Sequence, residues 1–381
     1  MTPDELDKQI RNISSMYNSL EGEIIKIIAR RLNRGNRDIT YWQAQKLQEL
    51  RLFNSEVVEQ LSKVTKVSSP QIKQIFEDVG VGSVKDIDKA MPYPTKPLPT
   101  QLDTVLKGYL EQARSGVDNY VNQSLITTTY GIGTAQMAYT EVLNKTASWF
   151  NAGLYNFKDA LEKSIIELAQ KGIGSGLIDK GGRRWNLEGY VRSVLKSTLG
   201  RTYNTVRKER MAEYGVYTVL VSSHAGARPA CSIIQGNVVD LRPMEEIPPD
   251  SEYKSIYDPY WEAEYETPGG HRGVNCKHLH FPFIPGVNVN NQPVFDEELN
   301  ERVRVHRDTQ RRIEREIVKY KKNLIVAEEL GSDKVGYWQG MVRKRQAAMR
   351  EHLKNNGEYL GRDYTREKVY TPLDTLLKDF E

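Results

Sequence analysis

Apolar residues in the first ninety positions recur every three or four residues. In the stretch LDKQIRNISSMYNSLEGEIIKIIARRLNR the repeat runs from Ile10 to Ile28, and this is the period of an amphipathic α-helix. GNRDIT interrupts the repeat, and TYWQAQKLQELRLFN then predicts a second helix. SEVVEQLSKVTKVSSPQIKQIFEDVGV predicts two more, the second starting at Pro70 behind a Ser69 cap. We therefore predict a helical N-terminal domain over residues 1–90.

The clearest boundary in the chain follows this helical region. MPYPTKPLPTQ contains four prolines, Pro92, Pro94, Pro97 and Pro99, which a helix interior does not accommodate. We predict an extended linker or arm at 91–101. The helical period returns in the next hundred residues, with a flexible break at GIGSG (172–176) and a helix over 187–214 that ends at Gly215. Residues 102–215 are therefore predicted as a region of long helices.

The pattern changes at residue 216. VYTVLVSS is rich in β-branched residues, which is typical of a strand, and the turn-rich segments AGARP, QGN, IPPDS and TPGG follow it. From about residue 296 the helical period resumes, and a last helix is predicted in YWQGMVRKRQAAMREHLKN. The predicted fold class is mainly helical α+β, in which helical regions flank a small strand-and-loop module at about 216–290. Residues 291–381 form a basic helical C-terminal region.

Composition narrows the class of protein. The chain has 381 residues, of which 39% are hydrophobic and 27% charged, and none of its apolar runs is long enough to cross a bilayer. The N-terminus is acidic and polar, unlike a secretory signal. Two cysteines cannot form a disulfide framework. We expect no membrane-spanning segment and no small-molecule substrate.

Positive charge is concentrated in two segments although the net charge is only +4. Residues 180–210 carry nine Lys and Arg against two Glu, and residues 301–368 carry eighteen against eleven acidic residues. Such segments can bind phosphate backbones without sequence preference, or they can be solvated helix faces. The candidate nucleic-acid-binding residues are Arg183, Arg184, Arg192, Lys196, Arg201, Arg311, Arg312, Lys321, Lys322, Arg343, Lys344 and Arg345.

Soft metal ligands gather in the strand-and-loop module. Both cysteines and four of the six histidines lie between residues 224 and 280. Cys276, His278 and His280 alternate, so an extended strand would place them on one face, with Phe281 and Phe283 on the other face and free to enter a core. A structural zinc ion takes four Cys or His ligands. The best set is His224, Cys231, Cys276 and His278, with His271 or His280 as the spare, and one zinc ion would join two distant loops.

Two other interpretations of this cluster remain open. His224 could bond a loop carbonyl while both cysteines are buried as small hydrophobic residues. Alternatively, a nucleic-acid-processing enzyme, such as a nuclease, could use His224, Arg228, His271 and His278. A metal nuclease would need carboxylates beside the histidines, and the acidic residues between the two halves form no such pattern. We therefore expect no enzymatic activity and assign no catalytic residues.

The Cys/His residues lie in two motifs, SSHAGARPACSIIQG at 222–236 and GVNCKHLHFPFIPG at 273–286. Together these motifs resemble those of the tailed-phage minor capsid proteins, which are related to the phage Mu F-like head morphogenesis proteins. The matching positions in SSHAGARPACSIIQG and GVNCKHLHFPFIPG are His224, Gly226, Arg228, Pro229, Gln235, Gly236, Asn275, Cys276, His278, Pro282, Phe283 and Gly286. Cys231 stands where that family commonly has a His, and this exchange favours zinc because either residue can serve as a ligand. The helical tracts before and after the module are also similar to that family.

The resemblance implies a structural virion protein present in few copies. Its expected partners are the portal protein, the major capsid and scaffold proteins, and packaged double-stranded DNA, which it would contact without sequence preference. Its expected location is the capsid interior or the portal vertex, after assembly in the cytoplasm of the bacterial host. Expected roles are in DNA packaging, retention or delivery.

Overall fold

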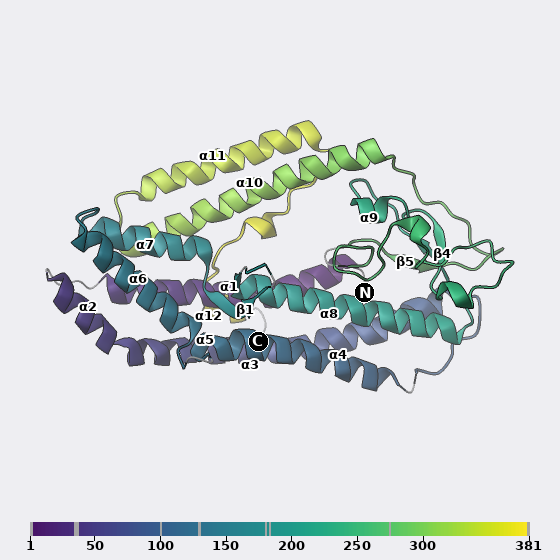
Figure 1. Cartoon of the computed structure of the whole chain (residues 1–381), viewed down its shortest axis with the longest axis horizontal. Helices are drawn as coiled ribbons and strands as arrows, with labels where there is room; N and C mark the ends of the chain where they lie inside the picture. The colour runs from purple at the N-terminus through teal and green to yellow at the C-terminus, as the bar shows by residue number, and fades with distance from the viewer. Residues whose placement is uncertain are drawn as a thin grey trace.

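The protein is described by a computed structural model that covers residues 3–33, 38–99, 101–128, 131–179, 181–182, 184–273 and 276–378. The molecule is elongated, with long helices running along it and the small strand-and-loop module at one end (Figure 1). The longer helices are α1 (Pro3–Leu32), α3 (Leu50–Ala90), α4 (Leu102–Val117), α6 (Thr134–Asn151), α7 (Phe157–Lys171), α8 (Leu187–Glu213), α10 (Glu297–Leu330) and α11 (Val335–Asn356). The predicted mainly helical α+β class is confirmed.

Shorter elements connect the long helices. They are α2 (Ile39–Gln48), the π-helix η1 (Asp118–Gln123), α5 (Ser124–Ile126), α9 (Pro229–Ser232), α12 (Leu373–Lys378) and the 3₁₀ turns η2 (Met244–Glu246), η3 (Pro259–Trp261) and η4 (Tyr364–Glu367). The strands are β1 (Gly174–Ile178), β2 (Arg184–Asn186), β3 (Thr218–Val221), β4 (Val238–Asp240) and β5 (His280–Pro282). The GIGSG segment, predicted as a flexible break, is instead largely strand, because β1 pairs antiparallel with β2.

One apolar core runs through α1, α3, α6, α7 and α8, and α10 and α12 add residues to it. Its members follow the three-and-four repeat, as Ile13, Leu20 and Ile24 on α1 show. Burial of such side chains contributes about 1.5–3 kcal/mol each. The helices before and after the proline-rich arm therefore share this core, while the proposed division into five regions stays a prediction.

A buried carboxylate ties distant parts of the chain to this core. Glu21 on α1 is 1% exposed, and its Oε1 accepts hydrogen bonds from Lys322 Nζ at 3.2 Å and from the Tyr370 hydroxyl at 3.2 Å. The other oxygen accepts from the backbone N–H of Ile173 at 3.1 Å. A buried charge needs such partners, and here they fix α10 and the C-terminal segment against α1.

The prediction of a helix break at Pro70 is wrong. α3 continues from Leu50 to Ala90 with Pro70 inside it, although proline removes one backbone hydrogen bond and usually costs about 3 kcal/mol in a helix interior. Residues on both sides of it, including Val64, Ile72 and Ile75, are buried in the core. Tertiary packing of this face offsets the local penalty.

The proline-rich arm is held in place by a buried arginine. Arg210 on α8 is 0% exposed, and it donates to both carboxylate oxygens of Asp88 at 2.6 and 2.9 Å. It also donates to the carbonyl oxygens of Lys96 at 2.7 Å and Pro97 at 2.9 Å. One side chain thus joins α8, the end of α3 and the arm.

The small module has its own sheet and core. The strand order is β4-β3-β5, and both pairings are antiparallel. Val219, Ile234 and Val239 lie in a separate apolar cluster that also includes Met211 from α8 and Ile87 from α3. The predicted strand at VYTVLVSS is confirmed as β3. Within the residues described, no helix is both long and apolar enough to span a membrane.

Candidate functional site

Two segments of the module meet at the Cys/His cluster. Cys231 lies on the one-turn helix α9, which starts with Pro229 at its first turn, and its side chain is 1% exposed. His271, Cys276 and His278 belong to the long loop before β5. His271 is 0% exposed and His278 is 2% exposed. The fold thus brings together side chains 45 positions apart.

The loop that carries His271 is tightly turned. The backbone N–H of His271 donates to the Ala263 carbonyl at 2.6 Å, and the His271 carbonyl accepts from Glu266 N–H at 2.8 Å. A Cβ at Gly270 would lie 1.9 Å from the Glu264 carbonyl oxygen, so only glycine fits there. The turn therefore fixes where the His271 ring lies.

The donor atoms of four residues converge. The donor atoms of Cys231, His271, Cys276 and His278 all lie within 4.8 Å of one another. The two Sγ atoms are 3.9 Å apart, and Cys276 Sγ is 3.4 Å from His278 Nδ1. The hydrogen bond between the two thiols lowers the pKa of Cys276 and raises that of Cys231, so the pair favours one thiolate.

The far nitrogens of the two histidines each have a partner. His278 Nε2 lies 3.0 Å from Gln235 Oε1, which can only accept, so Nε2 carries the proton and Nδ1 is free to face Cys276. His271 Nε2 lies 2.8 Å from His280 Nε2, while its buried Nδ1 has no hydrogen-bond partner among the described residues. Burial lowers the pKa of both His271 and His280, which favours neutral rings.

The structure departs from the predicted ligand set at one position. Cys231, Cys276 and His278 come together as predicted, but the fourth member of the group is His271, which the sequence analysis treated as a spare. His224 instead stacks its ring on His278 with centroids 4.3 Å apart, and its Nδ1 lies 3.2 Å from the Ala225 carbonyl. Burial and the charge of His278 lower the pKa of His224 to about 4.

The strand expected to align the ligands is shorter than predicted. β5 contains only His280–Pro282, so Cys276 and His278 precede it on the loop. Phe283 is buried as expected, whereas Phe281 is 40% exposed. The predicted entry of Phe281 into the core is therefore wrong.

Other residues of the two motifs shape the module. Gly226, Gly236 and Gly286 all have φ between 75° and 77°, a conformation that favours glycine. Arg228 Nη2 donates to the Gly270 carbonyl at 2.5 Å, which links the first motif to the His271 loop. Asn275 lies outside the described residues.

Sequence reasoning missed the helix residues that hold the first motif. Asn300 Oδ1 accepts from the backbone N–H groups of Gly226 at 2.9 Å and Ala227 at 3.3 Å. Arg307 donates to the Ala225 and Gly226 carbonyls at 3.0 Å each. Both residues lie on α10, more than 70 positions from the loop, and no local pattern marks them.

A basic cleft of about 840 Å³ adjoins the cluster, between α8, the start of α1 and the loop that carries Cys276 and His278. Its lining contains five cationic residues, Arg192, Lys196, Arg201, Arg272 and Lys277, against the carboxylates of Asp7 and Glu266. Partial burial lowers the pKa of Lys277, and the nearby charges of Arg307, Arg366 and Arg311 lower it further. Positive charges on α8, on the loop that carries Lys277, on α10 and on η4 therefore combine in and around this cleft.

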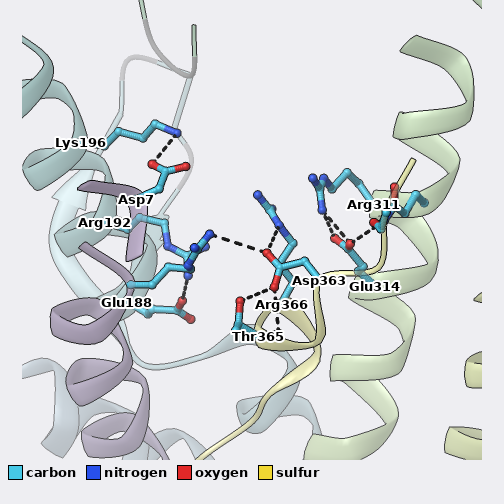
Figure 2. A network of polar contacts seen from close by, with 12 residues as sticks. Asp7, Glu188, Arg192, Lys196, Arg311, Glu314, Asp363, Thr365 and Arg366 are labelled. Carbon is cyan, nitrogen blue, oxygen red and sulfur yellow. Dashed lines mark hydrogen bonds and ion pairs between the residues drawn. The ribbon is translucent and has the colours of Figure 1, made fainter. Parts of the chain in front are cut away.

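Some of the cations in and near the cleft are paired with carboxylates. Figure 2 shows Lys196 paired with Asp7 at 3.4 Å and Arg192 with Glu188 at 2.6 Å. The figure also shows Arg366 paired with Asp363 and Arg311 paired with Glu314, with N–O distances of 3.2 and 2.6 Å; these four residues do not line the cleft. Arg201 and Lys277 have no carboxylate within ion-pair distance among the described residues.

The structure distributes the twelve predicted nucleic-acid-binding residues unevenly. Arg192, Lys196 and Arg201 line the cleft, and Arg311 is among the cations around Lys277. Arg184, Arg343 and Lys344 are exposed elsewhere, Arg312 and Arg345 pair with Glu316, and Arg183 lies outside the described residues. Lys322 is buried and paired with Glu21, and Lys321 donates to the Glu367 carbonyl at 2.6 Å.

Comparison with known proteins now identifies the family. The family described as phage minor capsid protein 2 matches residues 1–354. The chain belongs to the phage minor capsid protein 2 family. The resemblance noted in the two motifs is therefore confirmed, and it extends over most of the chain.

Two relatives of this minor capsid protein family come from phages. A structural protein of Lactococcus phage LL-H is 32% identical over 338 residues, which cover 87% of this chain and 90% of that protein. A structural protein of Lactococcus phage mv4 is 31% identical over 121 residues, which cover 32% of this chain and 98% of that protein. No solved structure matches the chain.

Proposed function

We propose that this member of the phage minor capsid protein 2 family is a non-enzymatic component of the phage head that contacts packaged double-stranded DNA through the basic cleft. The cleft is the observation that carries the proposal. Its lining has five cationic residues and two carboxylates, and more arginines surround Lys277. Arg201 and Lys277 have no carboxylate partner among the described residues, so phosphate oxygens of DNA would bind them. Such binding would be independent of base sequence.

The proposed location is the capsid interior or the portal vertex, where packaged DNA and the portal are both within reach. The proline-rich arm supports contact with capsid partners. Arg210 fixes its backbone, while residues 92–98 remain exposed. A rigid exposed segment loses little conformational entropy when a partner binds it. The portal protein and the major capsid or scaffold proteins are the partners we propose.

A structural role also agrees with the chemistry of the Cys/His cluster. The four converging residues are cysteines and histidines without a carboxylate, and three of them are at most 2% exposed. A hydrolytic metal site keeps an open position for water and a nearby base. Nothing in the geometry of the cluster favours the nuclease alternative.

Binding to duplex DNA at several salt concentrations tests the proposal. In the double variant Arg201→Gln/Lys277→Gln we expect weaker binding, and a salt slope smaller by about two, because each lost phosphate contact removes about 0.9 from the slope. The matched control is Arg343→Gln/Lys344→Gln on α11, which removes the same charge from an exposed surface away from the cleft. Equal weakening in both variants, or no binding at low salt, would contradict the proposal.

A further inference from the structure

Two of the distances between the converging donor atoms are close to those of a tetrahedral zinc site. Zinc ligands lie at about 2.3 Å for sulfur and about 2.0–2.1 Å for nitrogen. A tetrahedron with these bond lengths has edges of about 3.8 Å between two sulfurs and about 3.6 Å between sulfur and nitrogen. The structure has 3.9 Å between the Sγ atoms of Cys231 and Cys276, and 3.4 Å between Cys276 Sγ and His278 Nδ1.

The hydrogen bonds around the cluster leave the correct nitrogens available. Metal-bound histidines usually donate their other ring N–H to a fixed acceptor, which sets the tautomer and the ring orientation. His278 makes this bond to Gln235 Oε1 at 3.0 Å, and His271 makes the equivalent contact to His280 Nε2 at 2.8 Å. The Nδ1 of His271 is fully buried and has no hydrogen-bond partner among the described residues. A buried polar atom without a partner costs free energy, and a bound metal ion would remove this cost.

We propose that Cys231, His271, Cys276 and His278 bind one Zn²⁺ ion as a closed, tetrahedral structural site. Two thiolates and two imidazoles are a common structural zinc set. His224, whose ring lies stacked on His278, is not a ligand. The Sγ–Sγ distance of 3.9 Å is also well beyond the disulfide bond length of about 2.0 Å.

The ion would add a metal link between two segments that hydrogen bonds already join. Cys231 follows β3 through α9, and the other three ligands lie on the loop that leads into β5. That loop contributes Arg272, Cys276, Lys277 and His278 to the wall of the basic cleft. Zinc would therefore fix both the small sheet and one wall of the cleft, and a loop-rich module with a small core gains stability from such a link.

Metal analysis of the purified full-length chain tests the site. We expect about one zinc per chain, and loss of the metal in the Cys276→Ser and His271→Asn variants. The matched control is His224→Asn, which alters the half-buried histidine stacked on His278 and should keep the zinc. Substitution with Co²⁺ provides a second readout on folded wild-type protein, because two thiolate ligands in a tetrahedral site give both sulfur-to-cobalt charge-transfer bands and visible d–d bands.

Several results would overturn the inference. Wild-type protein that is folded, reduced and free of zinc, and that binds no Co²⁺, would exclude the site. Loss of zinc in His224→Asn together with its retention in His271→Asn would show that the ligand set is wrong. A Cys231–Cys276 disulfide, found by peptide mass analysis of protein kept away from oxidants, would replace the ion with a covalent link.

Discussion

Replacing Arg210 with methionine removes the charge that joins α8, α3 and the proline-rich arm while keeping most of the side-chain volume. Arg210 is 0% exposed, and it donates hydrogen bonds to Asp88, Glu213 and the carbonyl oxygens of Lys96 and Pro97. Methionine would leave the Asp88 carboxylate without its cation and two carbonyl groups without a donor. The change should therefore destabilise the protein.

The size of the effect follows from these contacts. Summing five charge-assisted hydrogen bonds at about 1.5–3 kcal/mol each would overshoot, because such bonds are not additive. The Glu213 side chain is 36% exposed, so this pair adds only about 0–1 kcal/mol. Removing one partner of a buried ion pair costs about 3–5 kcal/mol. We expect a loss in that range, which is a large fraction of a typical free energy of unfolding of about 5–15 kcal/mol.

Denaturant unfolding followed by circular dichroism measures this loss. The matched control is Arg201→Met on the same helix, an exposed position where we expect a change within about 0.5 kcal/mol. Native-state proteolysis gives a second readout, since release of the arm should speed cleavage within residues 92–99. Equal stability of Arg210→Met and Arg201→Met, with no new cleavage in the arm, would refute the reasoning.

Three further predictions follow from the same structure. Burial opposes ionisation of Asp88, but its bonds from Arg210 and Tyr214 outweigh burial and lower its pKa. The carboxylate therefore contributes stability above its unfolded pKa of about 3.9, which is lost as pH falls through the folded pKa, so Asp88→Asn should flatten the acid limb of a stability–pH profile. Gly270→Ala should destabilise the His271 loop, because its Cβ would lie 1.9 Å from the Glu264 carbonyl. Gly269→Ala, with no atom within 4 Å of the new Cβ, should have the melting temperature of the wild type; equal losses would contradict this. A strong chelator should lower the melting temperature of the wild type but not that of Cys276→Ser. The free energy of unfolding lost with the metal is about 4 kcal/mol when free zinc had exceeded its dissociation constant a thousandfold.

The helical part of the fold could be predicted because local pattern and tertiary packing agree there. The apolar repeat of α1 marks the same side chains that the core buries, from Ile10 to Ile28. Pro70 shows where the two disagree, since its local signal favours a helix start while the buried face of α3 continues through it. A rule based on local sequence cannot account for tertiary packing that offsets a local penalty.

The Cys/His cluster could be predicted only in part. Residue type and clustering indicated Cys231, Cys276 and His278, but the choice between His224 and His271 depends on the turn at 263–271, which the spacing does not reveal. The basic segments were visible as charge excesses. The packing of α1, α8 and α10 decides which of these cations face the cleft. The same packing buries Lys322 against Glu21.

Crosslinking of protein to DNA in intact phage particles tests the proposed function most directly. Purified DNA-filled particles would be irradiated with ultraviolet light and digested, and the peptides attached to nucleotides would be mapped, with empty procapsids as the control. We predict that the chain is present in the particles and that its crosslinks fall in residues 192–204 and 276–279, which line the basic cleft. Absence of the chain from the particles, or crosslinks confined to the exposed face of α11, would contradict the account.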